Sequence, residues 1–344
     1  MDTATINTNE NKTPDLQPNK PTTPGNSSTA KPRKALLTKF VTLSTAKDEE
    51  EDMRVVLQYA EKRAGFVDGL NCRWEEIQQL VAFHCGLANP GLVQMPEIFD
   101  GLKVVWLHGS FNLCIPVCIN SAGLDHSGRL LPSKLGFRVP LPYKLGEDAF
   151  PRNAEEKVRS EAATYIWIDK NCPDVPIPVL RGFGVPGGLS VGLLQPLTKC
   201  KLLTPASTQF YEPRVVPFWQ RIKFYTWRFD RCLVPQHRIG FWTIDNEGHI
   251  TLTNCPMFFH FNQFEKWSIP SSIPWSRTYT SADSFYLDLL SGHDNCLRYQ
   301  RNSAFSEIDA HGQARDLVLM RALLHQFTDQ QLCDGPFVMQ LTDM

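Results

Sequence analysis

The sequence predicts an α+β fold of two lobes, with an antiparallel sheet in the first lobe and a mainly helical second lobe. Three observations predict it. Apolar residues first recur at intervals of three and four, which is typical of helices. From Val104 the pattern changes to short apolar runs separated by polar turns, which is typical of antiparallel strands. A helical stretch and one further strand follow, and helical spacing dominates towards the C-terminus.

Composition limits the classes of function. The chain has 344 residues, of which 42% are hydrophobic, enough for about two domains or one two-lobed unit. Because 35 Lys and Arg oppose 36 Asp and Glu, the formal charge is −1, which argues against a nucleic-acid partner. No run approaches the roughly 18 apolar residues that span a bilayer. Ten cysteines without a CxxC pair favour a reducing compartment, so we expect a cytoplasmic protein without a membrane span.

Shifts in composition predict the domain limits. Residues 1–34 are rich in Thr, Asn, Pro, Ser and Lys and hold no aromatic side chain, so they cannot bury enough area to offset the entropy of ordering. We therefore expect a disordered tail over residues 1–48. Residues 49–200 are expected to form the first lobe with its leading helices, and residues 201–344 an incomplete second lobe.

Two helices are predicted to lead the first lobe. The acidic run 47–52 precedes apolar residues at 53, 56, 60 and 64, which indicates a helix with favourable acids at its N-terminus. Asn71 is a good N-cap for a second helix, and Gly86 ends it. His84 and Cys85 have no partner ligands at metal spacing, so we interpret them as packed helix residues.

The sheet is predicted from three runs and the segments after them. Residues 104–107 and 113–119 read as strands joined by a turn that contains Gly109, and residues 137–141 as a third strand. Even spacing would place Cys114 and Cys118 on one face. Residues 153–169 follow helical spacing, and residues 179–184 fit an edge strand after two prolines. The order β-β-β-α-β is that of the small lobe of a protein-kinase-like fold.

The second half is less regular. Residues 218–233 form a basic, aromatic helical pattern, which fits a helix held between lobes better than one on a membrane surface. A hairpin is predicted over residues 238–252, around Asp245-Asn-Glu-Gly248. Helices are expected over residues 281–299 and 314–327, and a terminal strand over residues 337–342.

Several segments together resemble the fungal branch of the aminoglycoside phosphotransferase-like, protein-kinase-like superfamily. The resemblance covers most of residues 70–344. The segments that carry it are 108–117, 138–147, 156–167, 171–178 with Gly182-Phe-Gly184, 239–248 and 335–343. It implies a protein-kinase-like two-lobed fold and ATP-dependent, Mg²⁺-assisted phosphoryl transfer to a small-molecule hydroxyl.

The resemblance assigns roles to individual residues. The turn with Gly109, Ser110 and Asn112 would lie over the nucleotide phosphates, although an ordinary hairpin turn explains the local sequence equally well. Arg138 stands where a kinase keeps its phosphate-binding lysine, and Glu161 where a helix acid holds that cation. The alternative for this pair is a solvated surface contact worth well under about 1 kcal/mol. Lys134 and Lys144 are nearby substitutes for the cation.

Asp343 matches the aspartate that accepts the proton of the attacking hydroxyl in the family. The family's two magnesium ligands would follow it, but the sequence ends at Met344, and the hinge that receives adenine is shortened between Leu233 and Ile239. We therefore expect a phosphotransferase impaired in this form, or alternatively a catalytically inactive kinase-like module that binds a protein partner. No GxSxG, HExxH or GxxxxGK[ST] string supports another enzyme class.

Overall fold

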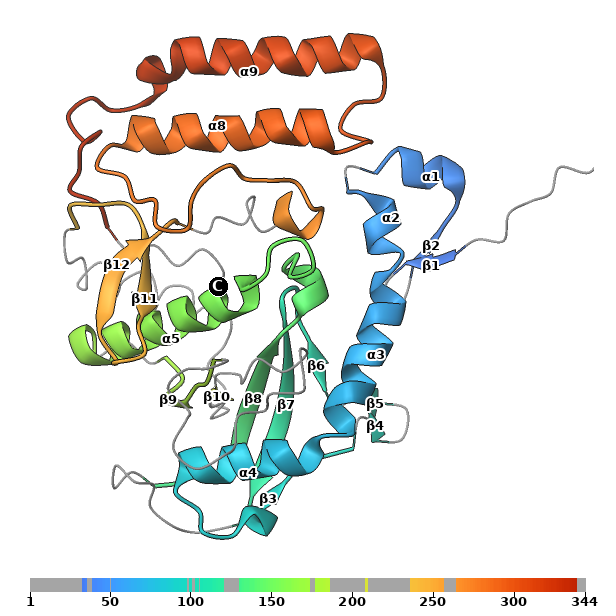
Figure 1. Cartoon of the computed structure of the whole chain (residues 1–344), viewed down its shortest axis with the longest axis vertical. Helices are drawn as coiled ribbons and strands as arrows, with labels where there is room; N and C mark the ends of the chain where they lie inside the picture. The colour runs from blue at the N-terminus through green and yellow to red at the C-terminus, as the bar shows by residue number, and fades with distance from the viewer. Residues whose placement is uncertain are drawn as a thin grey trace, which may run out of the picture.

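In the computed structural model, the chain is a mixed α and β protein with antiparallel sheets, and its largest sheet lies among helices (Figure 1). This confirms the α+β class with an antiparallel sheet. The structure describes residues 33–35, 39–49, 51–97, 99–100, 103–104, 106–120, 130–173, 177–185, 208–209, 236–256 and 264–338.

The largest sheet has strand order β3-β7-β8-β10-β9, and β6 pairs with the same edge of β7 as β3 does. Its strands are β3 (Val93–Gln94), β6 (Leu107–His108), β7 (Asn112–Ile119), β8 (Lys134–Pro140), β9 (Leu180–Gly182) and β10 (Thr208–Gln209). Along the chain, β6, β7, β8, the helix α5 (Asn153–Asn171) and β9 follow one another. The predicted order of three strands, a helix and a strand is therefore present, but the first strand is β6 and not residues 104–107, since Val104 belongs to a separate hairpin.

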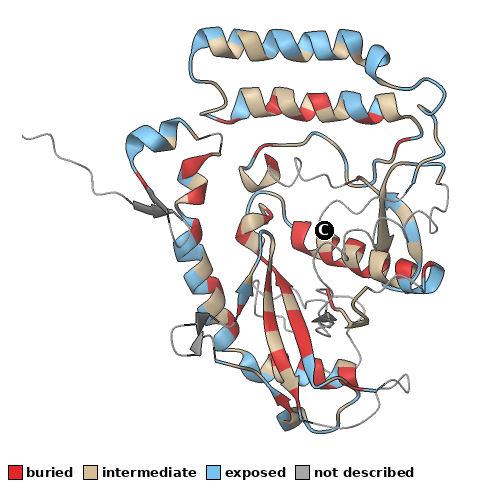
Figure 2. Cartoon of the chain, turned by 180° about the vertical axis from the view of Figure 1, so that it is seen from behind, coloured by how far each residue is buried: buried red, intermediate tan, exposed pale blue. Residues whose placement is uncertain are grey.

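Side-chain alternation fixes which face of β7 meets the core. Leu113, Ile115 and Val117 are at most 1% exposed, whereas the residues between them are only partly buried. Because successive strand residues point to opposite faces, Cys114 and Cys118 share the less buried face, as the spacing predicted. The buried face packs with the two helices α3 (Tyr59–Asn71) and α4 (Trp74–Cys85) in one core (Figure 2).

The leading helices differ from the prediction at two points. The first predicted helix is split into α2 (Met53–Val56) and α3, and Asp52 caps α2 by accepting a hydrogen bond from the Arg54 backbone N–H at 3.1 Å. Asn71 is not the N-cap of α4. It is the last residue of α3, which runs on because Phe66 and Leu70 continue its buried stripe. Gly86 does end α4, with φ of 69° in the left-handed region.

Part of the segment expected to be a disordered tail has regular structure. β1 (Arg33–Ala35) pairs with β2 (Lys39–Val41), and α1 (Leu43–Lys47) follows. Val41 is 5% exposed and belongs to the main core, which gives this segment an anchor that composition alone did not show. Thr42 and Thr45 form a capping box at the start of α1.

A predicted hairpin covers α5. β11 (Phe241–Ile244) pairs with β12 (Ile250–Asn254), with Asp245 to Gly248 in the turn as expected. Arg159 of α5 donates to the Ile244 carbonyl at 2.8 Å and to the Asn246 amide oxygen at 2.6 Å. Trp167 stacks on Trp242 with ring centroids 5.6 Å apart. These contacts fix α5 against the hairpin and so orient the side chains that α5 presents to the sheet.

The C-terminal part forms a helical pair in which α9 (Glu307–Phe327) lies outside α8 (Ala282–Tyr299), as Figure 1 shows. Arg321 of α9 forms an ion pair with Asp294 of α8. The helix predicted over 314–327 begins seven residues earlier than predicted, where Ser306 caps it.

Four further short elements of the described residues are η1 (Pro90–Leu92), β4 (Phe99–Asp100), β5 (Lys103–Val104) and η2 (Pro142–Lys144).

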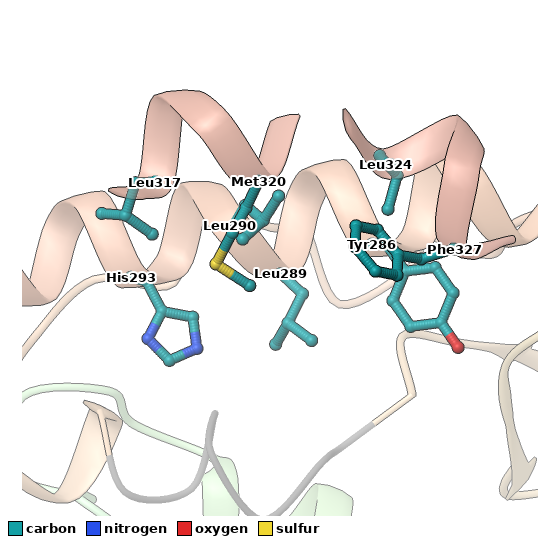
Figure 3. Close-up of a pocket in the computed structure, with 8 residues that line it drawn as sticks. All are labelled: Tyr286, Leu289, Leu290, His293, Leu317, Met320, Leu324 and Phe327. Atoms are coloured by element: carbon teal, nitrogen blue, oxygen red, sulfur yellow. The ribbon is translucent and has the colours of Figure 1, made fainter. Parts of the chain in front are cut away.

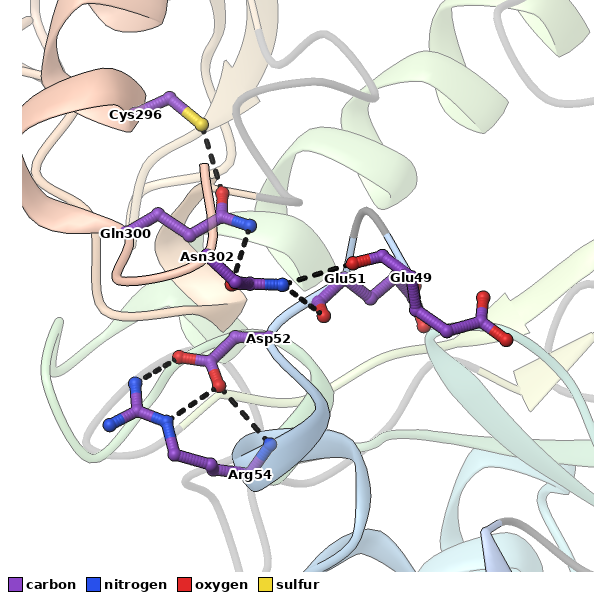
Figure 4. A network of polar contacts seen from close by, with 7 residues as sticks. All are labelled: Glu49, Glu51, Asp52, Arg54, Cys296, Gln300 and Asn302. Atoms are coloured by element: carbon purple, nitrogen blue, oxygen red, sulfur yellow. Dashed lines mark hydrogen bonds and ion pairs between the residues drawn. The ribbon is translucent and has the colours of Figure 1, made fainter. Parts of the chain in front are cut away.

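Asn302 joins the end of α8 to the N-terminal segment (Figure 4). Its side-chain amide donates to the carbonyls of Glu49 at 3.0 Å and Glu51 at 2.9 Å, and it accepts from the Gln300 amide at 3.1 Å. Lys266 adds an ion pair to Glu51 at 2.9 Å. The segment before α2 is thereby tied to Lys266 and to the end of α8.

We expect Asn302→Ala to lower the free energy of unfolding by about 1 to 3 kcal/mol, because two backbone carbonyls lose their donor. Urea unfolding followed by circular dichroism measures the change. Gln331→Ala, at an exposed position with a similar side chain, serves as the control and should leave the stability within about 0.5 kcal/mol. Equal effects of the two substitutions would contradict a joining role for Asn302.

Other predictions fall partly or wholly outside the described residues. The helical pattern over 218–233 lies outside them, as do residues 339–342 of the expected terminal strand. At its start, Phe337 forms an isolated bridge with Gln236. Within the described part of the chain, no helix combines the length and the apolar composition that a bilayer crossing requires.

Candidate active site at the Arg138 and Glu161 contact

The turn between β6 and β7 is a tight hairpin. The Gly109 backbone N–H donates to the Asn112 carbonyl at 2.8 Å, which leaves Ser110 and Phe111 as the two loop residues. A Cβ on residue 109 would meet that same carbonyl at 3.3 Å, so glycine suits the close approach. Gly109 and Ser110 are exposed. The N–H of Gly109 is used within the hairpin, so it is not available to a ligand, whereas the hydroxyl of the exposed Ser110 can donate.

Arg138 and Glu161 lie together, as the resemblance implied. Arg138 is on β8 opposite Cys114 of β7, and Glu161 is on α5. Arg138 Nη2 lies 3.2 Å from Glu161 Oε1, and the two side chains are 23% and 20% exposed. The pair is therefore mostly buried, which argues against the alternative of a fully solvated surface contact.

Lys157 is a third member of the cluster that the sequence analysis missed. Its Nζ lies 2.5 Å from the same Glu161 oxygen and 6.0 Å from the centre of the Phe111 ring. The spacing of four residues between Lys157 and Glu161 on one helix was a usable signal for this ion pair. Burial opposes ionisation of Glu161, but the charges of Lys157 and then Arg138 outweigh it, so the pKa of Glu161 lies below its usual value.

Asn112 completes the setting of Arg138. With its side-chain amide turned so that the oxygen faces the guanidinium, Asn112 accepts from Nη2 at 2.5 Å and from Nε at 3.1 Å. Glu161 and Asn112 thus occupy the N–H groups of Nη2 and Nε. These contacts of Arg138 with described residues use Nη2 and Nε, and the two N–H groups of Nη1 can bind an oxyanion. Two cations around one carboxylate leave a local charge of +1 for such a ligand.

The suggested substitutes for Arg138 lie elsewhere. Lys134 is exposed at the start of β8, four residues and about 13 Å along the strand. Lys144 lies over the Tyr59 ring, with Nζ 4.2 Å from its centre.

Asp343 lies outside the described residues. Within the residues that the structure does describe, no group of three or more His, Cys, Asp or Glu side chains could hold a metal ion.

Two cavities lie away from this cluster. The first, of about 430 Å³, is formed between α8 and α9 (Figure 3), and the second, of about 700 Å³, lies where α3 meets α4. Neither is lined by Arg138 or Glu161. In the first cavity, His293 and Tyr286 are the polar lining residues among leucines, Met320 and Phe327, so it fits an apolar group and not a nucleotide.

Comparison of the chain with protein-family models, with curated proteins and with solved structures gives no match. The geometry of the site therefore carries the functional argument.

Proposed function

We propose that the chain is a kinase-like protein that binds the phosphates of ATP at Arg138. The observation that carries the proposal is the contact between Arg138 of β8 and Glu161 of α5 at 3.2 Å. The acid holds the guanidinium in one orientation, as a kinase holds its phosphate-binding cation. The order β6, β7, β8, α5, β9 supports the same small-lobe architecture.

Chemistry supports phosphate as the ligand. A guanidinium presents planar N–H groups that match the oxygens of a phosphate, and here Nη1 has no acceptor among the described residues. Lys157 adds a second positive charge 2.5 Å from the shared Glu161 oxygen. Ser110, exposed at the adjoining turn, can donate a hydroxyl hydrogen bond. The bound phosphates would interact with Arg138, Lys157 and Ser110.

The proposed reaction is transfer of the terminal phosphoryl group to a small-molecule hydroxyl, with Asp343 as the group that orients the acceptor. Mg²⁺ would neutralise charge on the phosphates when bound, but we assign it to no residue of the described part of the chain. The second candidate is a binding module without catalysis, in which the same Arg138 cluster binds nucleotide and a protein partner binds the nucleotide-bound form. The contact with Glu161 supports both candidates equally, because it positions Arg138 to bind phosphate in either case.

The dependence of affinity on the number of phosphates in the nucleotide tests the proposal. We expect calorimetry to give affinity that rises from adenosine to ADP to ATP, because each phosphate adds contacts to Arg138 and Lys157. Glu161→Gln should weaken ATP binding while leaving adenosine unaffected, since only the orientation of the two cations is lost. Equal affinity for ATP and adenosine would overturn phosphate recognition. Phosphate release from ATP in the presence of a hydroxyl acceptor then separates the two candidates.

A further inference from the structure

One face of α3 carries polar side chains into the protein beside the main sheet. Tyr59, Arg63 and Phe66 are spaced by four and three residues, so they lie along one side of the helix. Tyr59 is 1% exposed and Phe66 4% exposed. The phenol of Tyr59 and Nη1 of Arg63 are fully buried, and neither has a hydrogen-bond partner in the described part of the chain.

Two further elements close around this face. Tyr143, at η2, packs its ring against Tyr59 with centroids 5.7 Å apart and against Phe66 at 6.2 Å. The Tyr143 hydroxyl lies 3.0 Å from Nε2 of His108 on β6. Because Arg63 stands between Tyr59 and Phe66 on the helix, its guanidinium is directed towards this same group. The positive charge of Arg63 also acts on both His108 and Tyr143.

The cluster has more donors and positive charge than acceptors. Lys144 lies over Tyr59, with Nζ 4.2 Å from the ring centre, and forms no ion pair with a described carboxylate. The acids near the cluster have their own cations, since Glu51 pairs with Lys266 at 2.9 Å and Asp52 with Arg54. Burial lowers the pKa of His108 to about 4, so the imidazole is neutral at pH 7.

Arg63 is partly buried, and its buried Nη1 carries a share of a charge that the guanidinium cannot lose, so an acceptor beside Nη1 would stabilise it. Buried polar groups without partners in native proteins are commonly satisfied by water or by an ion. Here the Tyr59 hydroxyl can donate and Nη1 of Arg63 can only donate, and Arg63 and Lys144 are both positively charged, so an acceptor with negative charge suits the cluster.

We propose that Arg63, Lys144 and Tyr59 form a binding site for a phosphate group, supplied either as inorganic phosphate or by a phosphomonoester. A guanidinium, an ammonium and a phenol approach from two elements, α3 and η2, and a tetrahedral oxyanion can accept from several directions at once. Nothing in the Arg138 cluster takes part in this site.

The site is separate from the Arg138 cluster because the two lie on opposite faces of the sheet. His108 is opposite Leu113, whose side chain enters the core with α3 and α4. Arg138 is opposite Cys114, the next residue along β7, and successive strand residues face opposite ways. The chain would thus hold two anion sites, one on each side of the turn at Gly109.

Isothermal titration with inorganic phosphate tests the site, in an Arg138→Gln background so that the first cluster does not contribute. We expect binding that Arg63→Met weakens about tenfold or more, because charge-assisted hydrogen bonds are lost. Lys62→Gln is the matched control, since Lys62 is the neighbouring residue on α3 but is exposed and paired with Asp148 at 3.1 Å. Glycerol phosphate as a second probe shows whether a phosphomonoester enters.

Stability without phosphate gives an independent readout. In phosphate-free buffer, Arg63→Met should melt at the same temperature as the parent or higher, because an unbalanced buried charge is removed. If Arg63→Met fails to fold, Lys144→Gln takes its place in the titration and should also weaken binding about tenfold. The proposal is overturned if neither probe binds, if Lys62→Gln weakens binding as much as the test variants, or if Lys144→Gln leaves the affinity unchanged.

Discussion

Gly146→Ala is expected to lower the free energy of unfolding by about 3 kcal/mol or more. Gly146 has φ of 66°, a conformation that alanine adopts only at a cost. The added Cβ would also lie 2.2 Å from the carbonyl oxygen of Glu265 and 2.6 Å from its carbonyl carbon. Since both are backbone atoms, the segment at residue 265 must move away from the turn that holds Gly146 between η2 and α5.

Gly69→Ala is the matched control for this measurement. Gly69 lies inside α3, and a Cβ there meets nothing within 4 Å. The control should raise stability by about 0.5 to 1 kcal/mol, because glycine is a poor residue in a helix interior. Chemical denaturation measures both variants, and a loss under about 1 kcal/mol for Gly146→Ala would contradict the close contact between the two segments.

The contact region between α5 and the segment at residue 265 is expected to make stability depend on pH through Glu156, which is buried, and Glu265, which is partly buried. Glu156 of α5 accepts from the Asn254 amide at 3.2 Å, and Glu265 accepts from the Asn153 amide at 2.8 Å. Burial, against the opposing effects of Asn254 and Arg152, raises the pKa of Glu156 to about 7. Burial and then the charge of Glu156 raise the pKa of Glu265 to about 7. The other titratable groups around the pair are Cys255, Tyr279 and Asp288.

The direction of the pH dependence follows because the pKa of each glutamate is higher in the folded state than the unfolded value of about 4.3. A protonated glutamate is favoured by the folded state, so its contribution is fully present below about pH 4 and is lost as the pH rises to 7. Well above pH 7 both carboxyls are ionised in both states and the contribution no longer changes. We therefore expect the free energy of unfolding to fall between about pH 4.5 and pH 7 on account of this pair.

Glu156→Gln should raise the free energy of unfolding at pH 8 by about 2 to 3 kcal/mol, since one pKa unit corresponds to about 1.4 kcal/mol. The amide oxygen can still accept from Asn254, so the hydrogen bond is kept. Urea unfolding at pH 5, 6, 7 and 8 should also show that the free energy of unfolding falls less steeply with rising pH in this variant than in the parent chain. Glu247→Gln, in the exposed turn of the β11–β12 hairpin, is the control and should change neither value. A destabilised Glu156→Gln at pH 8 would show that the ionised carboxylate is needed.

Local patterns predicted the elements that depend on local chemistry. The alternation along residues 112–119 predicted β7 with its buried face, the helical spacing predicted α5, and the turn residues Asp245 to Gly248 predicted the β11–β12 hairpin. Within the candidate site, the contact of Arg138 with Glu161 was implied by the resemblance, and the structure places the two side chains 3.2 Å apart.

Features that depend on tertiary packing were missed. Asn71 has a good capping side chain, but the buried stripe of α3 continues past Leu70 and determines where that helix ends. Glu156 and Glu265 meet although 109 residues separate them, so no spacing reveals the pair. No sequence motif marks Arg63, because its significance comes from the tertiary structure, in which its buried Nη1 has no acceptor in the described part of the chain.

The dissociation constant of ATP for the purified chain, measured with and without Mg²⁺ and compared with Arg138→Gln, tests the central claim most directly. We predict that ATP binds and that Arg138→Gln weakens binding about tenfold or more, because a charge-assisted contact to the phosphates is lost. Lys134→Gln, which removes an exposed cation four residues away on the same strand, should leave the affinity nearly unchanged. A folded chain that does not bind ATP, or equal losses in the two variants, would contradict the claim.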